Sequence, residues 1–431
     1  MELKIEKLIY GGDGLSRLPA DESGRGKAVF VPFVLENEHI EAAITESKPG
    51  FARAKADRIL EASQHRVPPP CPYFSNCGGC HYQHSTYEHQ LEIKAAILRE
   101  NLRRIAKLEF TSELEIHPSV PWNYRNRTRM RIRTHPEFAI GYYRFASHEL
   151  LPVDQCPISS PLINRAISRV WELGRAGRLG EAIKEIEFFS DAEDANLLVE
   201  LYCLGEPAQA AGSWAEGIRP ALPEIAGVAA FPSGAADQSM HSLPSPAVVG
   251  AGHLAFRTAH AEYRVSTGSF FQTNRHLTDE LVNIVAGGQS GRTAIDLYAG
   301  VGLFSVVLSR EFERVIAVES SPQSYGDLVY NAPVNVKSFQ SSVEQYLKDR
   351  AGSIRADLVI VDPPRGGLGE RTAREIAKIN SPALTYVSCD PATLARDLVP
   401  LLAAGYRVDQ VHLVDLFPQT FHLETVLRLV R

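Results

Sequence analysis

The chain has 431 residues, of which 44% are hydrophobic and 22% are charged, a composition typical of a globular protein with about two to four domains. No apolar run approaches the roughly 18 residues that a transmembrane helix needs, and the N-terminal segment lacks a signal-peptide core, so we expect a cytoplasmic protein without membrane association. The net charge of −6 argues against a uniformly basic nucleic-acid-binding chain, and six cysteines are too few for a disulfide framework.

The first 62 residues are typical of an all-β domain. Short strand-like runs cover residues 3–10, 26–35, 38–46 and 51–60, and GGDG and KPG supply turn signals between them. This pattern predicts a small OB-like barrel of about four or five strands, a fold that often binds oligonucleotides. A barrel without a binding role is the alternative.

A tight cysteine cluster follows in CPYFSNCGGC, which contains Cys71, Cys77 and Cys80. In a cytosolic protein such spacing favours a metal site or catalysis over a disulfide. A zinc site that recruits His81 or His84 and an iron–sulfur site both stay open at this point.

Residues 63–265 are predicted to form a mixed central domain. Apolar residues at helical spacing predict a helix over 86–106, and a mostly β region follows from about 110 to 265. Its later part, 205–260, is rich in Ala, Gly, Pro and Ser, and we expect loops there.

Within this region, arginine occupies every second position of YRNRTRMRIR. Alternate side chains of a strand share one face, so these guanidinium groups should lie together. Such a stripe indicates either a solvated edge strand or a surface that follows RNA phosphates, and its charges need an anion or carboxylates to offset them. The arginines are Arg125, Arg127, Arg129, Arg131 and Arg133.

Residues 266–431 alternate between apolar runs of strand length and helix-like segments. TAIDLYAG, RVIAVES, ADLVIVDPP and ALTYVSCD are the strand-like runs. This alternation predicts an α/β domain with a parallel sheet and crossover helices, in the manner of a Rossmann fold. The last 26 residues or so are predicted to form a β-hairpin at the edge of the sheet.

The run TAIDLYAGVGLFS indicates a nucleotide-type cofactor site at a strand–turn–helix junction. It is not GxGxxG, because Ser305 stands at the third glycine position. Asp296 would repel a diphosphate and attract a sulfonium cofactor with a free amino group, and Glu319 ends the next strand, where a carboxylate binds ribose hydroxyls. These residues favour S-adenosylmethionine over NAD.

Three polar residues follow C-terminal strands at the positions where open α/β sheets place their active sites. They are Asp362 in VDPPRGGL, Cys389 in VSCDPATLARD and Glu424 in PQTFHLETV. Because Pro391 predicts a helix start, the Cys389 thiol should lie at a helix N-terminus, whose partial charge favours thiolate.

These motifs together resemble the RNA uracil-5-methyltransferase family, most of all the members that modify 23S ribosomal RNA and carry an N-terminal TRAM domain and a 4Fe–4S cluster. The resemblance spans nearly the whole chain. It rests on CPYFSNCGGC, DQCPI, GSFFQTN, DLYAGVGLFS, DPPRGGL, YVSCDPATLARD and FPQTFHLE.

The resemblance implies a class I methyltransferase domain over 266–431 and transfer of a methyl group from S-adenosylmethionine to carbon 5 of a uridine. It implies Cys389 as the nucleophile and Glu424 as the base. Contacts to the cofactor are implied for Gln272, Tyr298, Glu319 and Asp362. A 4Fe–4S cluster is implied on Cys71, Cys77, Cys80 and Cys156, the last followed by Pro157 as iron–sulfur ligands often are.

Alternatives remain for the substrate and for the class of protein. The same reaction could act on transfer RNA, and an RNA-binding protein that has lost activity is a second possibility. Radical S-adenosylmethionine chemistry fits less well, because its cysteines are usually spaced C-x3-C-x2-C. We expect ribosomal RNA as the partner and a monomeric chain.

Overall fold

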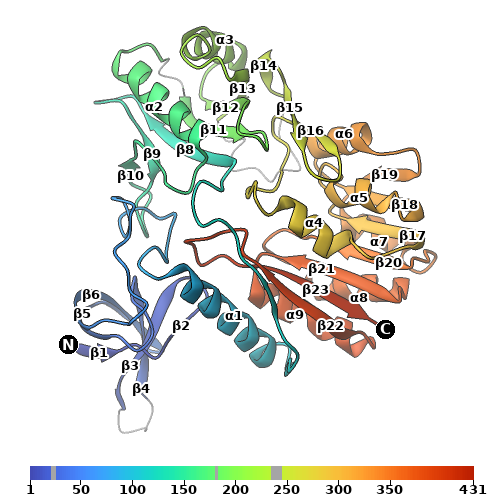
Figure 1. Ribbon diagram of the computed structural model, residues 1–431, viewed down its shortest axis with the longest axis horizontal. Helices are drawn as coiled ribbons and strands as arrows, with labels where there is room; N and C mark the ends of the chain where they lie inside the picture. Colours follow the sequence, from blue (N-terminus) through green and yellow to red (C-terminus); the bar gives the residue numbers. More distant parts are fainter. Residues whose placement is uncertain (21–25, 180–182, 234–244) are drawn as a thin grey trace.

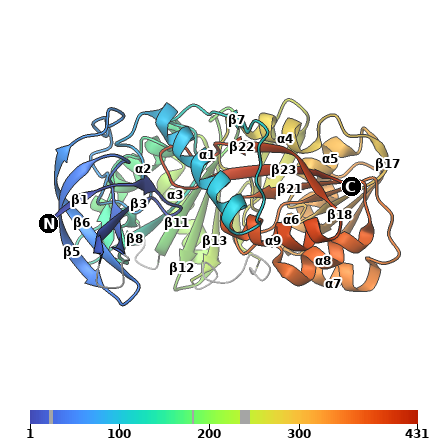
Figure 2. The same cartoon turned by 90° about the horizontal axis from the view of Figure 1, so that it is seen from below.

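The computed structural model describes residues 1–20, 26–179, 183–233 and 245–431. In these residues, three large sheets and one separate hairpin organise the chain. We name the large sheets the barrel sheet, the central sheet and the C-terminal sheet, in the order in which they occur along the chain (Figure 1). Figure 2 shows the barrel and the C-terminal sheet at opposite ends of the molecule.

The barrel sheet closes on itself. Its strand order is β1-β5-β6-β4-β3-β2, and β1 and β2 are consecutive in sequence, so the two edges of the sheet meet. Small and β-branched residues fill its interior, including Val29, Val31 and Ile40. The strands are β1 Glu2–Lys4, β2 Lys7–Leu8, β3 Asp13–Ala20, β4 Gly26–Pro32, β5 His39–Ser47 and β6 Phe51–Glu61. The predicted barrel is present, although strand β3 was not anticipated.

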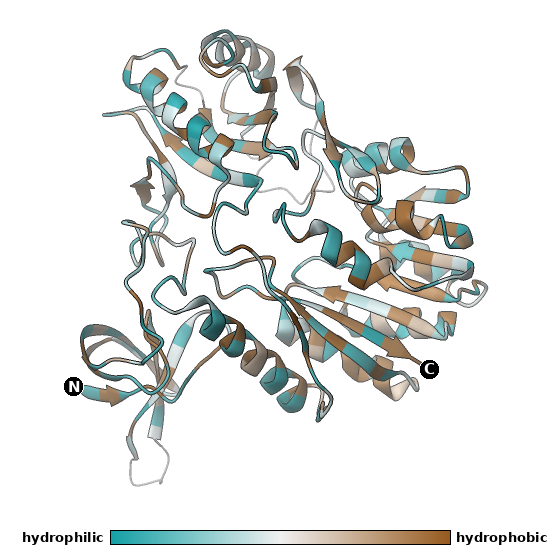
Figure 3. Cartoon of the chain, viewed as in Figure 1, coloured by the Kyte–Doolittle hydropathy of each residue, from teal (hydrophilic) through white to brown (hydrophobic). Residues whose placement is uncertain are grey.

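Helix α1, Tyr87–Arg104, matches the helix predicted from apolar spacing. Ile93, Ile97, Leu98 and Leu102 are buried, and they belong to the same hydrophobic core as the C-terminal sheet. Figure 3 shows hydrophilic and hydrophobic bands alternating along this helix. The helix therefore packs with the C-terminal domain and not only with the central domain to which we assigned it.

The central sheet has the order β10-β9-β8-β11-β12-β13-β14. Helices α2 and α3 cover it through Leu162, Ile163, Val170 and Trp214, which lie in one core with its strands. Its elements are β8 Arg127–Arg133, β9 Ala139–Tyr143, β10 Leu150–Pro152, α2 Pro161–Arg175, β11 Ile183–Ser190, β12 Leu197–Cys203, α3 Pro207–Ile218, β13 Ile225–Pro232 and β14 Ala247–Gly250.

The loops predicted over 205–260 are largely wrong. This stretch contains α3, β13, β14 and the first strand of the hairpin formed by β15 His253–Arg257 and β16 Glu262–Ser266; residues 234–244 lie outside the described residues. Small residues suit these elements because Ala210, Ala211 and Ala230 are buried in the core that α2 and α3 form with the central sheet. Composition suggested loops where tight packing required alanine.

The C-terminal sheet has the order β19-β18-β17-β20-β21-β23-β22-β7. The strands from β19 to β21 are parallel, and β23 runs antiparallel between β21 and β22. Its strands are β7 Glu115–His117, β17 Gly291–Leu297, β18 Phe312–Glu319, β19 Val336–Gln340, β20 Leu358–Val361, β21 Ala383–Ser388, β22 Arg407–Val414 and β23 Glu424–Val430.

Helices cover both faces of this sheet. One face carries α1, α7, α8 and α9, and the other carries α4 and α5. The helices are α4 Thr278–Ala286, α5 Leu303–Leu308, α6 Pro322–Asn331, α7 Val343–Arg350, α8 Gly369–Ile379 and α9 Pro391–Ala403. The predicted hairpin β22–β23 exists, but β7 pairs with β22 and forms the edge instead. None of the described helices is long and apolar enough to cross a membrane.

Candidate active site

The strand ends of the C-terminal sheet bring the predicted catalytic residues together. The antiparallel ladder between β21 and β23 ends with Ser388 opposite Thr425, so the next residues along it are Cys389 and Glu424. Asp362 follows β20, the neighbour of β21 on the other side. All three therefore lie at the carboxyl edge of the parallel strands, where α/β sheets bind ligands.

The Cys389 thiol lies in an acidic environment. Burial raises its pKa to about 12, and the charges of Glu424, Asp362 and Asp390 act in the same direction, while Arg365 acts against them. Helix α9 does begin just after the thiol, but the Asp390 side chain caps it by accepting from the backbone N–H groups of Ala392 and Thr393. Our expectation of a stabilised thiolate is therefore wrong for the free enzyme.

Burial raises the pKa values of the carboxyl groups at this site. Burial raises the pKa of Glu424 well above its usual range, and Asp362 adds to the effect. Burial also raises the pKa of Asp362 to about 7, with a contribution from Asp296, and that of Asp296 to about 7. Such crowding of acids at a strand edge is typical of a functional site.

The predicted cofactor turn has strained, open geometry. Tyr298, directly after β17, has a φ of +66°, which a non-glycine residue adopts only when its surroundings enforce it. At Gly300, φ is +56° and no described atom lies within 4 Å of the place that a Cβ would take. The buried Asp296 hydrogen-bonds Ser305 Oγ through one oxygen, whereas its Oδ1 has no partner among the described residues. A polar cofactor with a cationic group fits this turn.

Glu319 lies where the sequence placed it, at the end of β18. Its Oε2 accepts from the Gly300 N–H at 2.9 Å, and its Oε1 accepts from the N–H groups of Ser320 and Ser321. The carboxylate thus fixes the glycine turn to the next strand.

Gln272 lies in a segment that joins the central sheet to the active site. It is buried, and its carbonyl accepts from the Asn126 side chain at 3.0 Å. Two residues further on, the Asn274 side chain donates to Ser119 Oγ and to the Leu416 carbonyl. These bonds hold the segment 272–274 against the loop that leads to Glu424.

Sequence reasoning missed residues that complete this site. Tyr10 of the barrel donates a hydrogen bond to the Cys389 carbonyl at 3.2 Å and meets Phe421 edge-on, with ring centroids 5.4 Å apart. Arg365, within DPPRGGL, lowers the pKa of both Cys389 and Glu424. The motif could have pointed to Arg365, but nothing local to Tyr10 could have placed it beside a residue 379 positions away.

A sequence profile of the tRNA (uracil-5-)-methyltransferase family matches residues 86–431. The chain belongs to this family. It is an S-adenosylmethionine-dependent RNA uracil-5-methyltransferase, as the motifs predicted.

Relatives extend over the whole chain. A protein of Aquifex aeolicus, named an RNA methyltransferase, is 34% identical over 435 residues, which cover 99% of this chain and 97% of the relative. An RNA methyltransferase of Caldanaerobacter subterraneus is 32% identical, with coverage of 99% and 96%. The structure of the Pyrococcus abyssi tRNA (uracil-54, C5)-methyltransferase shares 24% identity, covers 100% of both chains and has a TM-score of 0.76, which confirms the predicted fold.

The four predicted cluster cysteines of this methyltransferase come together. Each pair among Cys71, Cys77, Cys80 and Cys156 interacts electrostatically, and none forms a disulfide. Burial and the neighbouring sulfurs raise the pKa of Cys77 to about 11 and that of Cys80 further. Three half-buried thiols and the buried thiol of Cys80 repel one another as thiolates, so they form a set that a bound cation would stabilise.

The sulfurs of these four cysteines lie further apart than the ligand atoms of one bound zinc ion would. Among the described residues, some groups of three His, Cys, Asp or Glu side chains have ligand atoms that all lie within 4.8 Å of one another, and none of these groups contains a cysteine. One tetrahedral zinc with bonds of about 2.3 Å would draw its sulfurs to within about 4 Å. Of the imidazoles in the zinc alternative, His84 has its Nε2 3.3 Å from the Val34 carbonyl, and His81 packs on Phe421. The Nδ1 atoms of both rings have no hydrogen-bond partner among the described residues.

The loop that contains the first three cysteines, residues 71–82, contacts the loop between β22 and β23 directly. We call the former the cysteine loop. The backbone N–H groups of His81 and Tyr82 both donate to the Gln419 carbonyl, at 2.8 and 3.0 Å. Gln90 of α1 exchanges two hydrogen bonds with Gln419, one with its side chain and one with its backbone. The loop that carries Glu424 is therefore anchored to the cysteine loop.

The arginine stripe is only partly a free basic surface. Met130 and Ile132 face the core, as the alternation predicted. On the other face, carboxylates of β11 pair with the arginines: Glu187 with Arg127 and Arg129, and Glu185 with Arg129 and Arg131. Arg127 is buried and Arg125, in the preceding segment, is half-buried, so the five guanidinium groups do not form one exposed row. Arg133 is exposed.

Proposed function

We propose that this enzyme methylates carbon 5 of a specific uridine in 23S ribosomal RNA through a covalent bond between Cys389 and carbon 6 of the uracil. The observation that carries the proposal is the β21–β23 register, which sets Cys389 beside Glu424 with Asp362 on the adjacent strand end. A nucleophile and a carboxyl base side by side are what this chemistry needs.

The chemistry follows from the weak reactivity of uracil. Carbon 5 is a poor nucleophile until a thiolate adds to carbon 6 and converts the ring to an enolate. S-adenosylmethionine, when bound, would supply its electrophilic methyl group to carbon 5, with the S–CH3 bond breaking and S-adenosylhomocysteine as the leaving group. A base then removes the proton from carbon 5, the double bond between carbons 5 and 6 re-forms, and the thiolate of Cys389 leaves.

Glu424 is our base, and its raised pKa suits that role. A carboxylate held in a buried site binds a proton more tightly than a solvated one, so it is the stronger base once it is ionised. Arg365 is the cation that opposes the acidic environment of Cys389 and Glu424, and we assign it to stabilising the thiolate and the developing enolate.

The cofactor would bind along the turn after β17. We assign Tyr298 to its wall, Glu319 to the ribose, and Asp362 and Gln272 to the cofactor or the target base. The open space at Gly300 and the unpartnered Asp296 Oδ1 support this placement.

Target access needs an unstacked uridine. The faces of carbons 5 and 6 are covered in a helix, so the base must be flipped out or lie in a loop. We assign RNA contacts to the barrel of residues 1–62, as a TRAM-like domain, and to the exposed arginines of the central domain, 63–265. A 4Fe–4S cluster on Cys71, Cys77, Cys80 and Cys156 would hold the cysteine loop against the loop that carries Glu424.

The covalent step can be tested directly. RNA containing 5-fluorouridine lacks a removable proton on carbon 5, so it should trap the enzyme as an adduct that survives denaturation. Cys389→Ala should give no adduct and no methyl transfer, whereas Cys203→Ala, a buried cysteine outside the site, should behave as wild type. Full activity of Cys389→Ala would exclude the mechanism.

Removal of the base should stop the reaction later. Glu424→Gln should form the methylated adduct on ordinary RNA and fail to release it, because the proton on carbon 5 stays in place. Gel electrophoresis under denaturing conditions with labelled cofactor measures the trapped species. Its absence would mean that another group is the base.

Transfer RNA is the second candidate substrate. The matching family is described by tRNA uracil-5-methylation, and the Pyrococcus abyssi enzyme of the same fold is a tRNA methyltransferase. Mapping 5-methyluridine in both RNA classes from a deletion strain would decide between them: loss from 23S RNA supports our proposal, and loss only from tRNA overturns the substrate assignment.

A further inference from the structure

A group of histidines and carboxylates lies at the β7 edge of the C-terminal sheet, apart from the catalytic residues. In the β22–β7 register, His412 is opposite Glu115 and Val414 is opposite His117. Glu115 and His117 are two residues apart on one strand, so their side chains share a face with the cross-strand neighbour His412. Strand pairing alone thus assembles two imidazoles and one carboxylate.

The distances between these groups match one coordination shell. His117 Nε2 and His412 Nδ1 are 3.1 Å apart, His412 Nδ1 and Glu115 Oε2 are 3.4 Å apart, and all three ligand atoms lie within 4.8 Å of one another. A tetrahedral ion with bonds of about 2.0–2.1 Å separates its ligand atoms by roughly 3.3 Å. The ring planes are inclined at 38°, so the two rings are not stacked in parallel.

A fourth residue, Glu280, orients His117 in the way that outer carboxylates orient histidine ligands of metals. Glu280 of α4 lies 2.9 Å from His117 Nδ1 through its Oε1. A carboxylate on one ring nitrogen fixes the proton there and leaves the other nitrogen, Nε2, as a lone-pair donor. This carboxylate–histidine pairing accompanies most histidine ligands of metals and raises their basicity.

We propose that Glu115, His117 and His412 bind one divalent transition-metal ion, with Glu280 as the outer carboxylate. Two imidazoles and one carboxylate suit zinc, with a water molecule as the remaining ligand. The ion would join β7, β22 and, through Glu280, helix α4. It would stabilise the edge of the sheet and is not part of methyl transfer.

The site has a structural consequence for the catalytic half of the molecule. Two residues after His117, the Ser119 N–H donates to the Tyr87 hydroxyl at 2.8 Å, and Ser119 Oγ accepts from Asn274 at 2.9 Å. An ion on β7 would therefore hold the start of the segment that supports 272–274.

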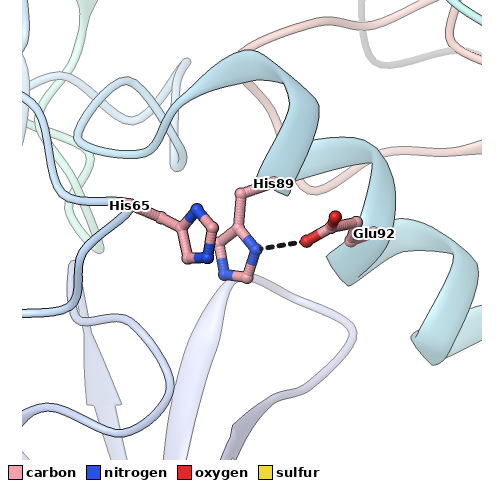
Figure 4. Close-up of side chains that lie close together, drawn as sticks. All are labelled: His65, His89 and Glu92. Carbon is pink, nitrogen blue, oxygen red and sulfur yellow. Dashed lines mark hydrogen bonds and ion pairs between the residues drawn. The ribbon is translucent and has the colours of Figure 1, made fainter.

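A second histidine group provides a matched control. His65, His89 and Glu92 also lie within 4.8 Å of one another, but the rings of His65 and His89 are stacked at 3.9 Å with planes 9° apart. Figure 4 shows His89 between His65 and Glu92, with its hydrogen bond directed to the carboxylate. Because the lone pairs of parallel rings cannot converge on one ion, we expect no metal there.

Calorimetric titration of zinc into full-length, chelator-treated protein tests the proposal. Iron and zinc are quantified before and after the titration, so that metal bound by the cysteine loop can be subtracted for every variant. Wild type and His65→Gln should bind one equivalent that magnesium does not displace. His412→Gln and Glu115→Gln should lose this equivalent, with affinity lowered about 100-fold or more, and Glu280→Gln should weaken it about tenfold. Zinc should also raise the melting temperature of wild type and not that of His412→Gln.

Glu115 protects the test against a folding defect, because its side chain is half exposed and its substitution leaves the core unchanged. Equal zinc binding by wild type, His412→Gln and Glu115→Gln would overturn the proposal. So would the absence of this equivalent in wild type, which would leave the two histidines as a hydrogen-bonded pair. Loss of binding in His65→Gln alone would place the metal at the other group.

Discussion

The catalytic thiol shows how strongly neighbours from other strands determine the state of one residue. Cys389 precedes a helix, a position that by itself lowers a thiol pKa. Burial and the carboxyl groups of Glu424, Asp362 and Asp390 outweigh that effect and raise the pKa to about 12. This raised pKa predicts that the free enzyme holds Cys389 mainly as the thiol and not as the thiolate.

This state predicts slow alkylation of the free enzyme. At pH 8, iodoacetamide should modify Cys389 at least about tenfold more slowly than free cysteine, because so little thiolate is present. Asp390→Asn keeps a side chain that can cap α9 but removes a negative charge, so the pKa of Cys389 should fall and the alkylation profile should move to lower pH. Mass spectrometry of the peptide containing Cys389 measures the alkylation rate of wild type and of Asp390→Asn. The same dependence of this rate on pH in both proteins would show that Asp390 has no electrostatic role.

The surroundings of strand β8 also depend on residues from distant parts of the chain. Its alternation was predicted from sequence, and the burial of Met130 and Ile132 agrees with it. What the alternating arginines face was not predictable, because Glu185 and Glu187 lie more than 50 residues later on β11. The guanidinium groups of Arg127 and Arg129 also stack on Phe189 and Tyr202, so these two arginines hold the sheet together.

The exposed end of β8 is where RNA contact should be sought. Replacing both Arg131 and Arg133 with Gln should weaken RNA binding and reduce the slope of log affinity against log salt by about one to two, since each phosphate contact contributes roughly 0.7–0.9. Binding measured across a range of KCl concentrations tests this. Arg169→Gln on α2, a surface arginine paired with Glu172, is the matched control, and an unchanged slope in the double variant would assign β8 a structural role only.

For the molecule as a whole, the loop between β22 and β23 is where three parts of the chain meet. Lys94 of α1 contacts Asp415 at 2.6 Å with both side chains fully buried, the cysteine loop binds Gln419, and Tyr124 donates to the Pro418 carbonyl. The barrel adds Tyr10 on the Cys389 carbonyl. The catalytic base is thus positioned by segments from the N-terminal half.

Breaking the buried ion pair between Lys94 and Asp415 tests whether α1 positions the loop between β22 and β23. Lys94→Met leaves the Asp415 carboxylate buried without its cation, which should lower the free energy of unfolding by about 3–5 kcal/mol and reduce methyl transfer. The Tyr87 hydroxyl donates to Asp415 Oδ2 at 2.9 Å. Lys94→Met with Asp415→Asn removes both charges and keeps an acceptor for this hydroxyl, so it should recover part of the stability. Urea unfolding of the three proteins measures the difference, and equal stability of all three would mean that the pair is dispensable.

Sequence alone determined many of the elements, although not β3 or those within 205–260, and it determined the reaction. Hydrophobic periodicity is a local property, so the barrel strands, helix α1 and the alternating C-terminal half could be predicted, and the motifs around Cys389 and Glu424 indicated uracil methylation. The charge state of Cys389, the carboxylate partners of the arginines, the anchoring of Gln419 and the metal-binding geometry of His117 with His412 were decided by tertiary structure. Each depends on groups that only the pairing of distant strands brings within a few ångströms, and local sequence carries no record of that pairing.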